Sequence, residues 1–227
     1  MMRARPYLLP SIICLLVAIG LTGCNRNPTQ STAAKKPGYN PAPAPPPPAK
    51  FDYYVLNMSW EPEFCATHNG AVECREKRGF VLHGLWPQNA DGTYPSGCAQ
   101  EPGLKNPAEF KDLNPDPALL EHEWRKHGTC TGLSARAYFE FTRKAVEKFS
   151  FPPIVTTLKH EDAIQTSRIL SRFHVVNPLF PAGSIVLSCG NNRLTAVEAC
   201  LTKDLQPTRC GEHLRSCRAK VIKVTPR

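Results

Sequence analysis

The chain has 227 residues, of which 41% are hydrophobic, enough for a folded core and too many for an intrinsically disordered protein. Its net charge is +9 at pH 7, but residues 1–50 hold six basic residues and no acidic one, so residues 51–227 carry 22 basic and 19 acidic residues, or +3. An excess this small permits a polyanionic ligand without indicating one.

The N-terminus has the pattern of an export signal. Arg3 and Arg5 precede an apolar run that ends at Leu21 and is too short for a comfortable membrane span. The run closes in Leu21-Thr22-Gly23-Cys24, which resembles the cleavage box of bacterial lipoproteins, where the cysteine becomes the lipidated first residue. We therefore expect residues 1–23 to be a signal peptide and Cys24 to carry a lipid, with cleavage nearby and no lipid as the alternative. The protein is then expected in the bacterial cell envelope, anchored on the periplasmic side, or secreted.

Residues 24–50 form the next unit, a proline-rich tether that follows the lipidated cysteine. Ten of the 23 prolines in the chain precede residue 51. This composition favours an extended polyproline II segment over a packed element. The folded domain is expected to span residues 51–227.

The cysteine count supports an oxidising compartment. Of the ten cysteines, Cys14 lies in the signal and Cys24 is the lipidation candidate. The other eight are Cys65, Cys74, Cys98, Cys130, Cys189, Cys200, Cys210 and Cys217. An even number in an exported domain indicates up to four disulfides, of undetermined pairing. No C-x-x-C pair occurs, which argues against a zinc ribbon.

Strands and helices are expected in separate runs along the domain. Strands are predicted at 51–60 and 80–87, with a small loop closed by Cys65 and Cys74 between them and a long loop at 88–117. Helices are predicted at 119–126, 134–149 (with Ser134 as N-cap) and 161–173, followed by strands at 184–189, 193–202 and 219–225. Without βαβ alternation, this order predicts an α+β fold, with helices packed against a central antiparallel β-sheet and disulfides stapling it.

The segment from His122 to Cys130 concentrates reactive side chains. On a helix that advances about 100° per residue, His122, Lys126, Glu123 and His127 lie at roughly 0°, 40°, 100° and 140°, which is one face. A zinc protease pattern requires histidines at i and i+4. Here they lie at i and i+5, with a lysine between them that would repel a dication. The remaining alternative, a solvated charged helix end, gives no reason for this grouping.

A second histidine, His83, lies in the apolar strand 80–87 and is followed by Gly-Leu-Trp-Pro. A lone strand histidine is more often a core residue, but two histidines can share acid and base roles without a metal. Lys126 would stabilise charge on phosphoryl oxygens. The cysteines are expected in disulfides and no G-x-S-x-G motif occurs, so the nucleophile would come from the substrate, as the 2′-hydroxyl of RNA does.

Two segments carry a family resemblance. Residues 80–87 (FVLHGLWP) and 119–130 (LLEHEWRKHGTC) resemble, in order and spacing, the two active-site segments of the T2 family of ribonucleases. The resemblance begins at the stretch from Tyr53 to Trp60 and covers about residues 51–227. It implies a metal-independent endoribonuclease that cleaves single-stranded RNA through a 2′,3′-cyclic phosphate and needs no cofactor.

The resemblance also implies a role for each catalytic position. His127 would take the proton from the 2′-hydroxyl, and His83 would protonate the leaving 5′-oxygen. Glu123 and Lys126 would stabilise the five-coordinate phosphorane, and His122 would hold the phosphate. We expect a monomer whose partners are RNA and, through Cys24, a membrane.

Base binding is implied for Trp86, Gln88 and Tyr94, which match positions that line the site for the base on the 5′ side of the cut. Stacking on aromatic faces tolerates any base. Gln88 stands where some members carry an acid that hydrogen-bonds the base, so low base specificity is expected. The plain alternative for Tyr94 is a turn residue before Pro95.

Disulfide pairs follow from the same resemblance: Cys65 with Cys74, Cys98 with Cys130, Cys189 with Cys217, and Cys200 with Cys210. Two rival functions remain. A non-catalytic RNA- or envelope-binding lipoprotein would not require a matched acid and base. A zinc hydrolase conflicts with the i, i+5 histidine spacing.

Overall fold

The computed structural model describes residues 47–227, so the predicted signal peptide, Cys24 and nearly all of the tether lie outside the described residues. The elements are β1 (Tyr53–Trp60), α1 (Glu61–Thr67), η1 (Val72–Arg75), β2 (Phe80–Gln88), η2 (Pro107–Phe110), α2 (Pro117–Lys126), η3 (Gly128–Cys130), α3 (Ala135–Glu147), α4 (Pro153–Thr156), β3 (Asp162–Gln165), α5 (Thr166–Val176), β4 (Ile185–Gly190), β5 (Arg193–Leu201) and β6 (Val221–Val224). Within this part of the chain, no helix has the length and apolar character needed to cross a membrane.

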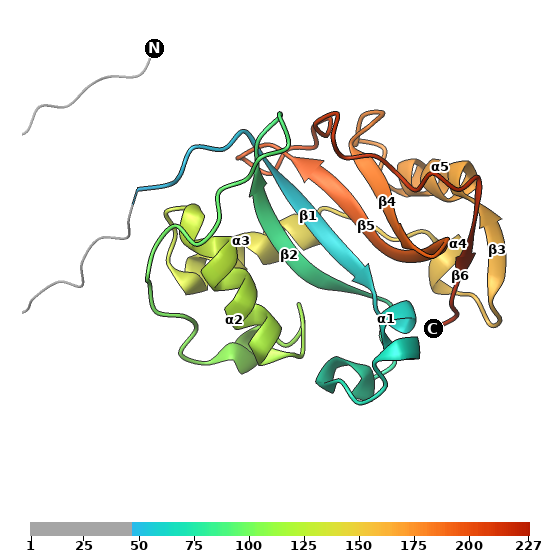
Figure 1. Cartoon of the computed structure of the whole chain (residues 1–227), viewed down its shortest axis with the longest axis horizontal. Helices are drawn as coiled ribbons and strands as arrows, with labels where there is room; N and C mark the ends of the chain where they lie inside the picture. The colour runs from blue at the N-terminus through green and yellow to red at the C-terminus, as the bar shows by residue number, and fades with distance from the viewer. Residues whose placement is uncertain (1–46) are drawn as a thin grey trace, which may run out of the picture. The chain divides into compact units, whose positions relative to one another are not determined.

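A six-stranded sheet forms the centre of the domain. Its strands follow the order β2-β1-β5-β6-β3, and β4 pairs with the other side of β5. Figure 1 shows β2, β1, β5 and β4 as the long central strands. The α+β fold predicted from the sequence is confirmed. The sheet is antiparallel except between β5 and β6, which meet in parallel at Arg193 and Lys223.

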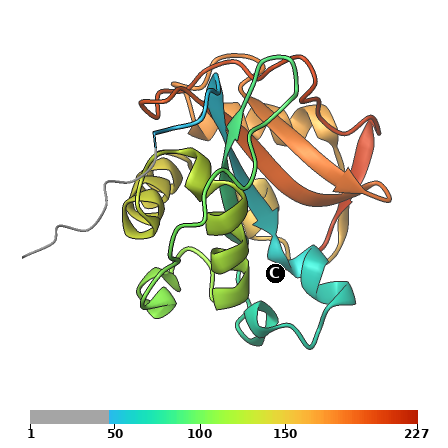
Figure 2. The ribbon, with the colours of Figure 1, turned by 60° about the vertical axis from the view of Figure 1, so that its left-hand side comes forward.

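One face of the sheet is the hydrophobic core. Leu56 and Trp60 of β1 belong to the same buried cluster as Phe139 of α3 and Phe173 of α5. Because side chains alternate along a strand, Ser59 points to the opposite face. In Figure 2, α2 and α3 come forward beside β2 and β1. The second face is therefore the one on which polar strand residues can meet a ligand.

A β-bulge in β2 decides where His83 points. Asn57 of β1 pairs with Gly84 and the next residue pairs with Leu82, so His83 is the extra residue opposite β1. The bulge lets Leu82 and Leu85, three positions apart, both enter the core, with 1% and 0% of their surface exposed. A bulge re-aims side chains in this way. His83 is thereby left on the polar face.

Two predicted segments differ from the structure. Residues 61–67, where no helix was predicted, form α1, which has a proline in its first turn, where the missing N–H costs nothing. The helix predicted at 161–173 is the strand β3 followed by α5. Ile164 is buried and pairs with Ile222 of β6, so a long-range strand pairing overrides the local helical pattern.

Candidate active site

Helix α2, which carries several of the candidate site residues, is held in place near both of its ends. The Asp116 side chain caps it by accepting a 2.9 Å hydrogen bond from the Ala118 backbone N–H, and Pro117 occupies the first turn. Trp124 is 1% exposed and holds the helix to the core. The helix ends at Lys126, and His127 leaves the helical path with φ −117° and ψ −45°.

The residues after α2 are tied to the preceding loop. Cys98 forms a disulfide with Cys130, and the backbone N–H of Cys98 donates to Oγ1 of Thr129 at 3.2 Å. The Gly97 N–H donates to the Lys126 carbonyl at 2.9 Å. One disulfide and two hydrogen bonds therefore hold this loop against the C-terminal end of α2.

Glu123 lies at the centre of the site. Its side chain is 2% exposed, and its Oε2 accepts a 2.7 Å hydrogen bond from Nε1 of Trp86. Its Oε1 lies 3.5 Å from Nε2 of His83, which is longer than a hydrogen bond. A Cβ at Gly84 would overlap this carboxylate, so glycine is required there for α2 to approach β2.

His83 is the more accessible imidazole, with 41% of its side chain exposed. Its Nδ1 lies 3.3 Å from Oγ of Ser59, and its ring meets Trp86 at a centroid distance of 5.4 Å and an interplanar angle of 80°. These contacts orient the ring with Nε2 toward Glu123. Ser59 was not predicted as a site residue.

His127 is the buried imidazole, with 5% of its surface exposed. Its ring stacks on Trp86 at 5.4 Å and 30°, and the Tyr94 ring lies 6.0 Å away. Its Nδ1 has no hydrogen-bond partner within residues 47–227. Trp86 thus contacts both imidazoles and the carboxylate between the two segments.

Burial and neighbouring charges shift the pKa values of this group. Burial lowers the pKa of His127 to about 3, helped by the positive charge of Lys126. Burial also lowers the pKa of His83, with further contributions from His122 and Lys126. Burial raises the pKa of Glu123 to about 7, against the hydrogen bond from Trp86. In the free protein near neutral pH, both imidazoles are therefore uncharged.

A pocket of about 170 Å³ opens beside His127. It is lined by Trp86, Gln88, Tyr94, Lys126 and His127. Tyr94 lies at its rim with 48% of its surface exposed. The three residues expected to bind a base therefore line the same pocket as two of the expected catalytic residues.

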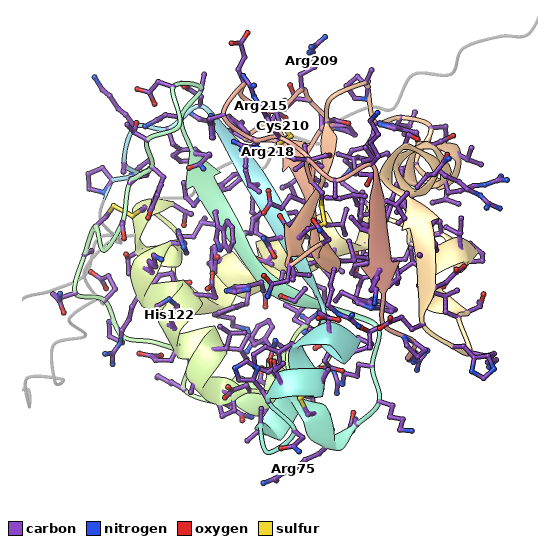
Figure 3. The ribbon with its side chains drawn as sticks, turned by 45° about the vertical axis from the view of Figure 1, so that its right-hand side comes forward. Arg75, His122, Arg209, Cys210, Arg215 and Arg218 are labelled. Atoms are coloured by element: carbon purple, nitrogen blue, oxygen red, sulfur yellow. A yellow bond between two sulfur atoms is a disulfide. The ribbon has the colours of Figure 1, made fainter. Side chains whose placement is uncertain are left out.

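His122 does not line this pocket and is exposed on α2, where Figure 3 labels it. It still lies near enough to influence the pKa values of both other histidines. The four side chains that were expected on one face of a helix therefore differ in their exposure to solvent. Glu123 and His127 are buried, Lys126 is half-buried, and His122 faces solvent.

Four disulfides are present, and their pairs are those that the resemblance implied. They join Cys65 to Cys74, Cys98 to Cys130, Cys189 to Cys217 and Cys200 to Cys210. Among the residues described by the structure, no three His, Cys, Asp or Glu side chains are grouped so that they could hold a metal ion.

Sequence comparison assigns this arrangement to a family. Residues 51–210 match the model of the Ribonuclease T2 family. The chain belongs to the ribonuclease T2 family. The matched segment contains both imidazoles, Glu123 and Lys126.

Several ribonucleases are similar to this T2 family member. A ribonuclease from Aeromonas hydrophila is 43% identical over 107 residues, which cover 45% of this chain and 48% of that protein. Ribonuclease DdI from Dictyostelium discoideum is 27% identical over 183 residues, covering 69% of this chain and 76% of that protein. The match to the Aeromonas protein thus spans about half of that relative's length.

Solved structures show the same fold. An RNase-related protein from Calystegia sepium has a TM-score of 0.62 at 23% identity, covering 78% of this chain and 98% of that chain. Ribonuclease MC1 from bitter gourd seeds has a TM-score of 0.60 at 21% identity, covering 76% of this chain and 99% of that one. The chain therefore shares its fold with proteins that are only 23% and 21% identical to it in sequence.

Proposed function

We propose that this T2 family member is a metal-independent endoribonuclease that cleaves single-stranded RNA with low base specificity. The proposal is carried by one observation: His83 and His127, from separate segments, both contact Trp86 beside Glu123. Similarity to ribonucleases from bacteria and Dictyostelium supports the reaction class.

His127 is the general base of the proposed first step. Its low pKa keeps the imidazole neutral, so it can accept the proton of the 2′-hydroxyl. The 2′-oxygen then attacks the adjacent phosphorus, and the bond from phosphorus to the 5′-oxygen breaks. The product is a 2′,3′-cyclic phosphate, with the proton held on His127.

His83 is the proposed general acid, which gives its proton to the leaving 5′-oxygen. Its greater exposure suits a group that must be protonated from solvent before each turnover. The negative charge of a bound phosphodiester favours the imidazolium and offsets the lowering of its pKa by His122 and Lys126. In the slower second step the roles reverse, and water opens the cyclic phosphate.

Lys126, Glu123 and His122 are the proposed stabilisers of the phosphorane. The Lys126 ammonium lines the pocket beside His127 and can pair with a non-bridging oxygen. Glu123, with its pKa near 7, is protonated over the acidic range and can donate a hydrogen bond to another oxygen. His122 is more exposed and suits a weaker contact with the phosphate.

The pocket of Trp86, Gln88 and Tyr94 is the proposed site for the base on the 5′ side of the cut. Two aromatic faces accept any base by stacking. Gln88 has both a donor and an acceptor in its amide, so it favours no single base edge.

The test is a digest of defined RNA with mapped ends. The proposal predicts 2′,3′-cyclic phosphate ends, cleavage that persists in EDTA, and no cleavage of DNA of the same sequence, which lacks the 2′-hydroxyl. Cleavage that stops on chelation, or that proceeds on DNA, would refute it. Fragments ending in one base alone would overturn the low specificity.

We also propose that the enzyme acts as a monomer in the bacterial envelope, anchored through Cys24 with residues 24–50 as the tether, or as a secreted protein if Cys24 is not lipidated. The support is the lipoprotein-like sequence at Leu21 to Cys24. Cys24→Ser is expected to move the protein from the membrane fraction to the soluble fraction. A variant that stays membrane-bound would exclude the lipid anchor.

A further inference from the structure

A second pocket lies beside β4, on the same face of the sheet as the catalytic residues and across the strands from α2. It has a volume of about 540 Å³, and its walls include Ser188 of β4 together with His213, Arg215, Ser216 and Arg218 of the loop after β5. Figure 3 labels Arg215 and Arg218 on that loop, with His122 on α2 on the other side of β2. Hydroxyl, imidazole and guanidinium groups are the donors that bind phosphate oxygens.

The cationic groups of this pocket are not neutralised by acids. Neither Arg215 nor Arg218 forms an ion pair within residues 47–227, whereas Arg136, Arg143 and Arg193 do. Arg215 instead donates through Nε to a backbone carbonyl at 2.9 Å. The two guanidinium groups are therefore available to an anion.

The pocket opens on the face of the sheet that carries the catalytic residues. Ser59 of β1 and Ser188 of β4 both pair with Ala196 of β5, from its two sides. Side chains of directly paired residues share a face. Ser59 contacts His83, so a straight line across the strands leads from His83 to the arginine pocket. Two strand spacings separate the two serines, about 10 Å.

Further polar side chains lie next to Ser59 and Ser188 on this face of the sheet. Asn57 Nδ2 and Ser188 Oγ both donate to Oε1 of Glu198, at 3.0 Å and 2.9 Å. Burial raises the pKa of Glu198, which weakens the negative charge that its carboxyl presents to an approaching phosphate. The surface between His83 and the arginine pocket is therefore polar. The carboxyl group of Glu198 lies on it, and its raised pKa means that it ionises less readily.

We propose that the pocket of Arg215 and Arg218 binds backbone phosphates of the RNA strand on the 3′ side of the cleaved bond. This inference rests on the proposed function, because the 3′ part of the strand begins at the oxygen that His83 protonates. The base pocket lies on the α2 side of His83, and the arginine pocket lies on the other side. A strand threaded across the sheet places its 3′ phosphates over Arg215 and Arg218.

The test uses DNA strands with a single ribonucleotide, which fix the cleaved bond. One series is extended stepwise on the 3′ side and a matched series on the 5′ side. For the wild type, KM is expected to fall with 3′ extension. In the double variant Arg215→Ala/Arg218→Ala that gain is lost, with KM up roughly tenfold on long substrates. The rate on a dinucleotide and kcat stay unchanged.

The matched control is Arg168→Ala/Arg172→Ala on α5, which removes the same charge from the helix packed against the opposite face. It is expected to behave as the wild type does. The dependence of log KM on log salt should weaken by about 1.4 in the Arg215/Arg218 variant, since each phosphate contact on a single strand contributes about 0.7. The control should keep the wild-type slope.

A second readout separates this inference from the proposed function. Fluorescence anisotropy with an all-DNA strand measures binding without cleavage, and the Arg215/Arg218 variant is expected to bind it more weakly than the control. If the wild type cuts no chimera, the proposed function fails, while anisotropy still reports on the pocket. Equal binding by both variants, or a loss confined to 5′ extension, overturns the inference. Selective loss of binding to anionic vesicles, without any length effect, would assign the pocket to a membrane surface and overturn it too.

Discussion

Nε1 of Trp86 donates a 2.7 Å hydrogen bond to Oε2 of Glu123. This bond joins β2, which carries His83, to α2, which His127 directly follows. The same indole ring contacts both imidazoles at 5.4 Å. The geometry of the proposed acid and base therefore depends on one tryptophan.

Replacing Trp86 by phenylalanine tests this dependence. Phenylalanine keeps an aromatic ring but removes the donor, so the buried Glu123 carboxyl loses its partner. Its pKa should rise further above about 7, because the hydrogen bond from Trp86 is what lowers it. Leaving a buried polar group without its partner costs about 1–3 kcal/mol, and the carboxyl is no longer held beside His83, so kcat should fall about 5- to 100-fold. An unchanged kcat in steady-state assays would contradict this role.

Gly84→Ala should disable the site without unfolding the domain. A Cβ at this position would overlap the Glu123 carboxylate and Nε1 of Trp86, forcing both away from His83. The overpacking should cost about 1–3 kcal/mol of unfolding free energy, and kcat/KM should fall at least tenfold. Gly70→Ala is the matched control, since nothing lies within 4 Å of its Cβ. Circular dichroism checks folding, and equal activity of the two variants would argue against the account.

The pH profile of kcat/KM follows from the histidine pKa values. His127 must be neutral, which holds above its pKa of about 3, and His83 must be protonated, which holds below a pKa lowered from its ordinary value near 6.5. Activity should therefore peak at acidic pH and fall on the alkaline side before neutrality. His122→Ala removes a group that lowers the pKa of His83, so the alkaline limb should move to higher pH. A limb that moves down would refute this coupling.

Two disulfides are expected to differ in their effect on activity. Cys98→Ser/Cys130→Ser opens a loop with a sequence separation of 32 and frees the residues after α2, and Cys65→Ser/Cys74→Ser opens one of 9. Chain entropy predicts losses of unfolding free energy of about 4 and about 3 kcal/mol. Denaturant unfolding measures these values. At a temperature where both variants are folded, only Cys98→Ser/Cys130→Ser should lose activity. Equal activities of the two variants would show that the Cys98–Cys130 disulfide does not position His127.

Much of the fold was predictable because local patterns and capping residues agree with it. The strands that became β1, β2, β4 and β5 have apolar or alternating sequences, and Ser134 caps α3 as expected. β3 was missed because four residues gain their strand only by pairing with β6. The pairing between β5 and β6 is likewise visible only once distant segments meet.

The sequence motifs named residues that the structure brings together around Trp86, but they did not predict the geometry of that group. The bulge that turns His83 to the polar face arises from the pairing of β2 with β1, which no local pattern encodes. Ser59 and Glu198 were not singled out, since a serine and a glutamate in strands are ordinary until the sheet order places them on one face. The signal that could have found Ser59 is its alternation with the buried residues of β1.

In the proposed mechanism, His83 and His127 act as acid and base on one phosphodiester. It is tested most directly by comparing His83→Ala and His127→Ala on two substrates, a uridine dinucleotide and uridine 3′-(p-nitrophenyl phosphate), whose leaving group needs no proton. On the dinucleotide each variant should lose about 10²- to 10⁴-fold in rate. On the activated substrate His83→Ala should recover most of the wild-type rate, while His127→Ala should remain slow. Equal losses for the two variants on both substrates would contradict the assignment.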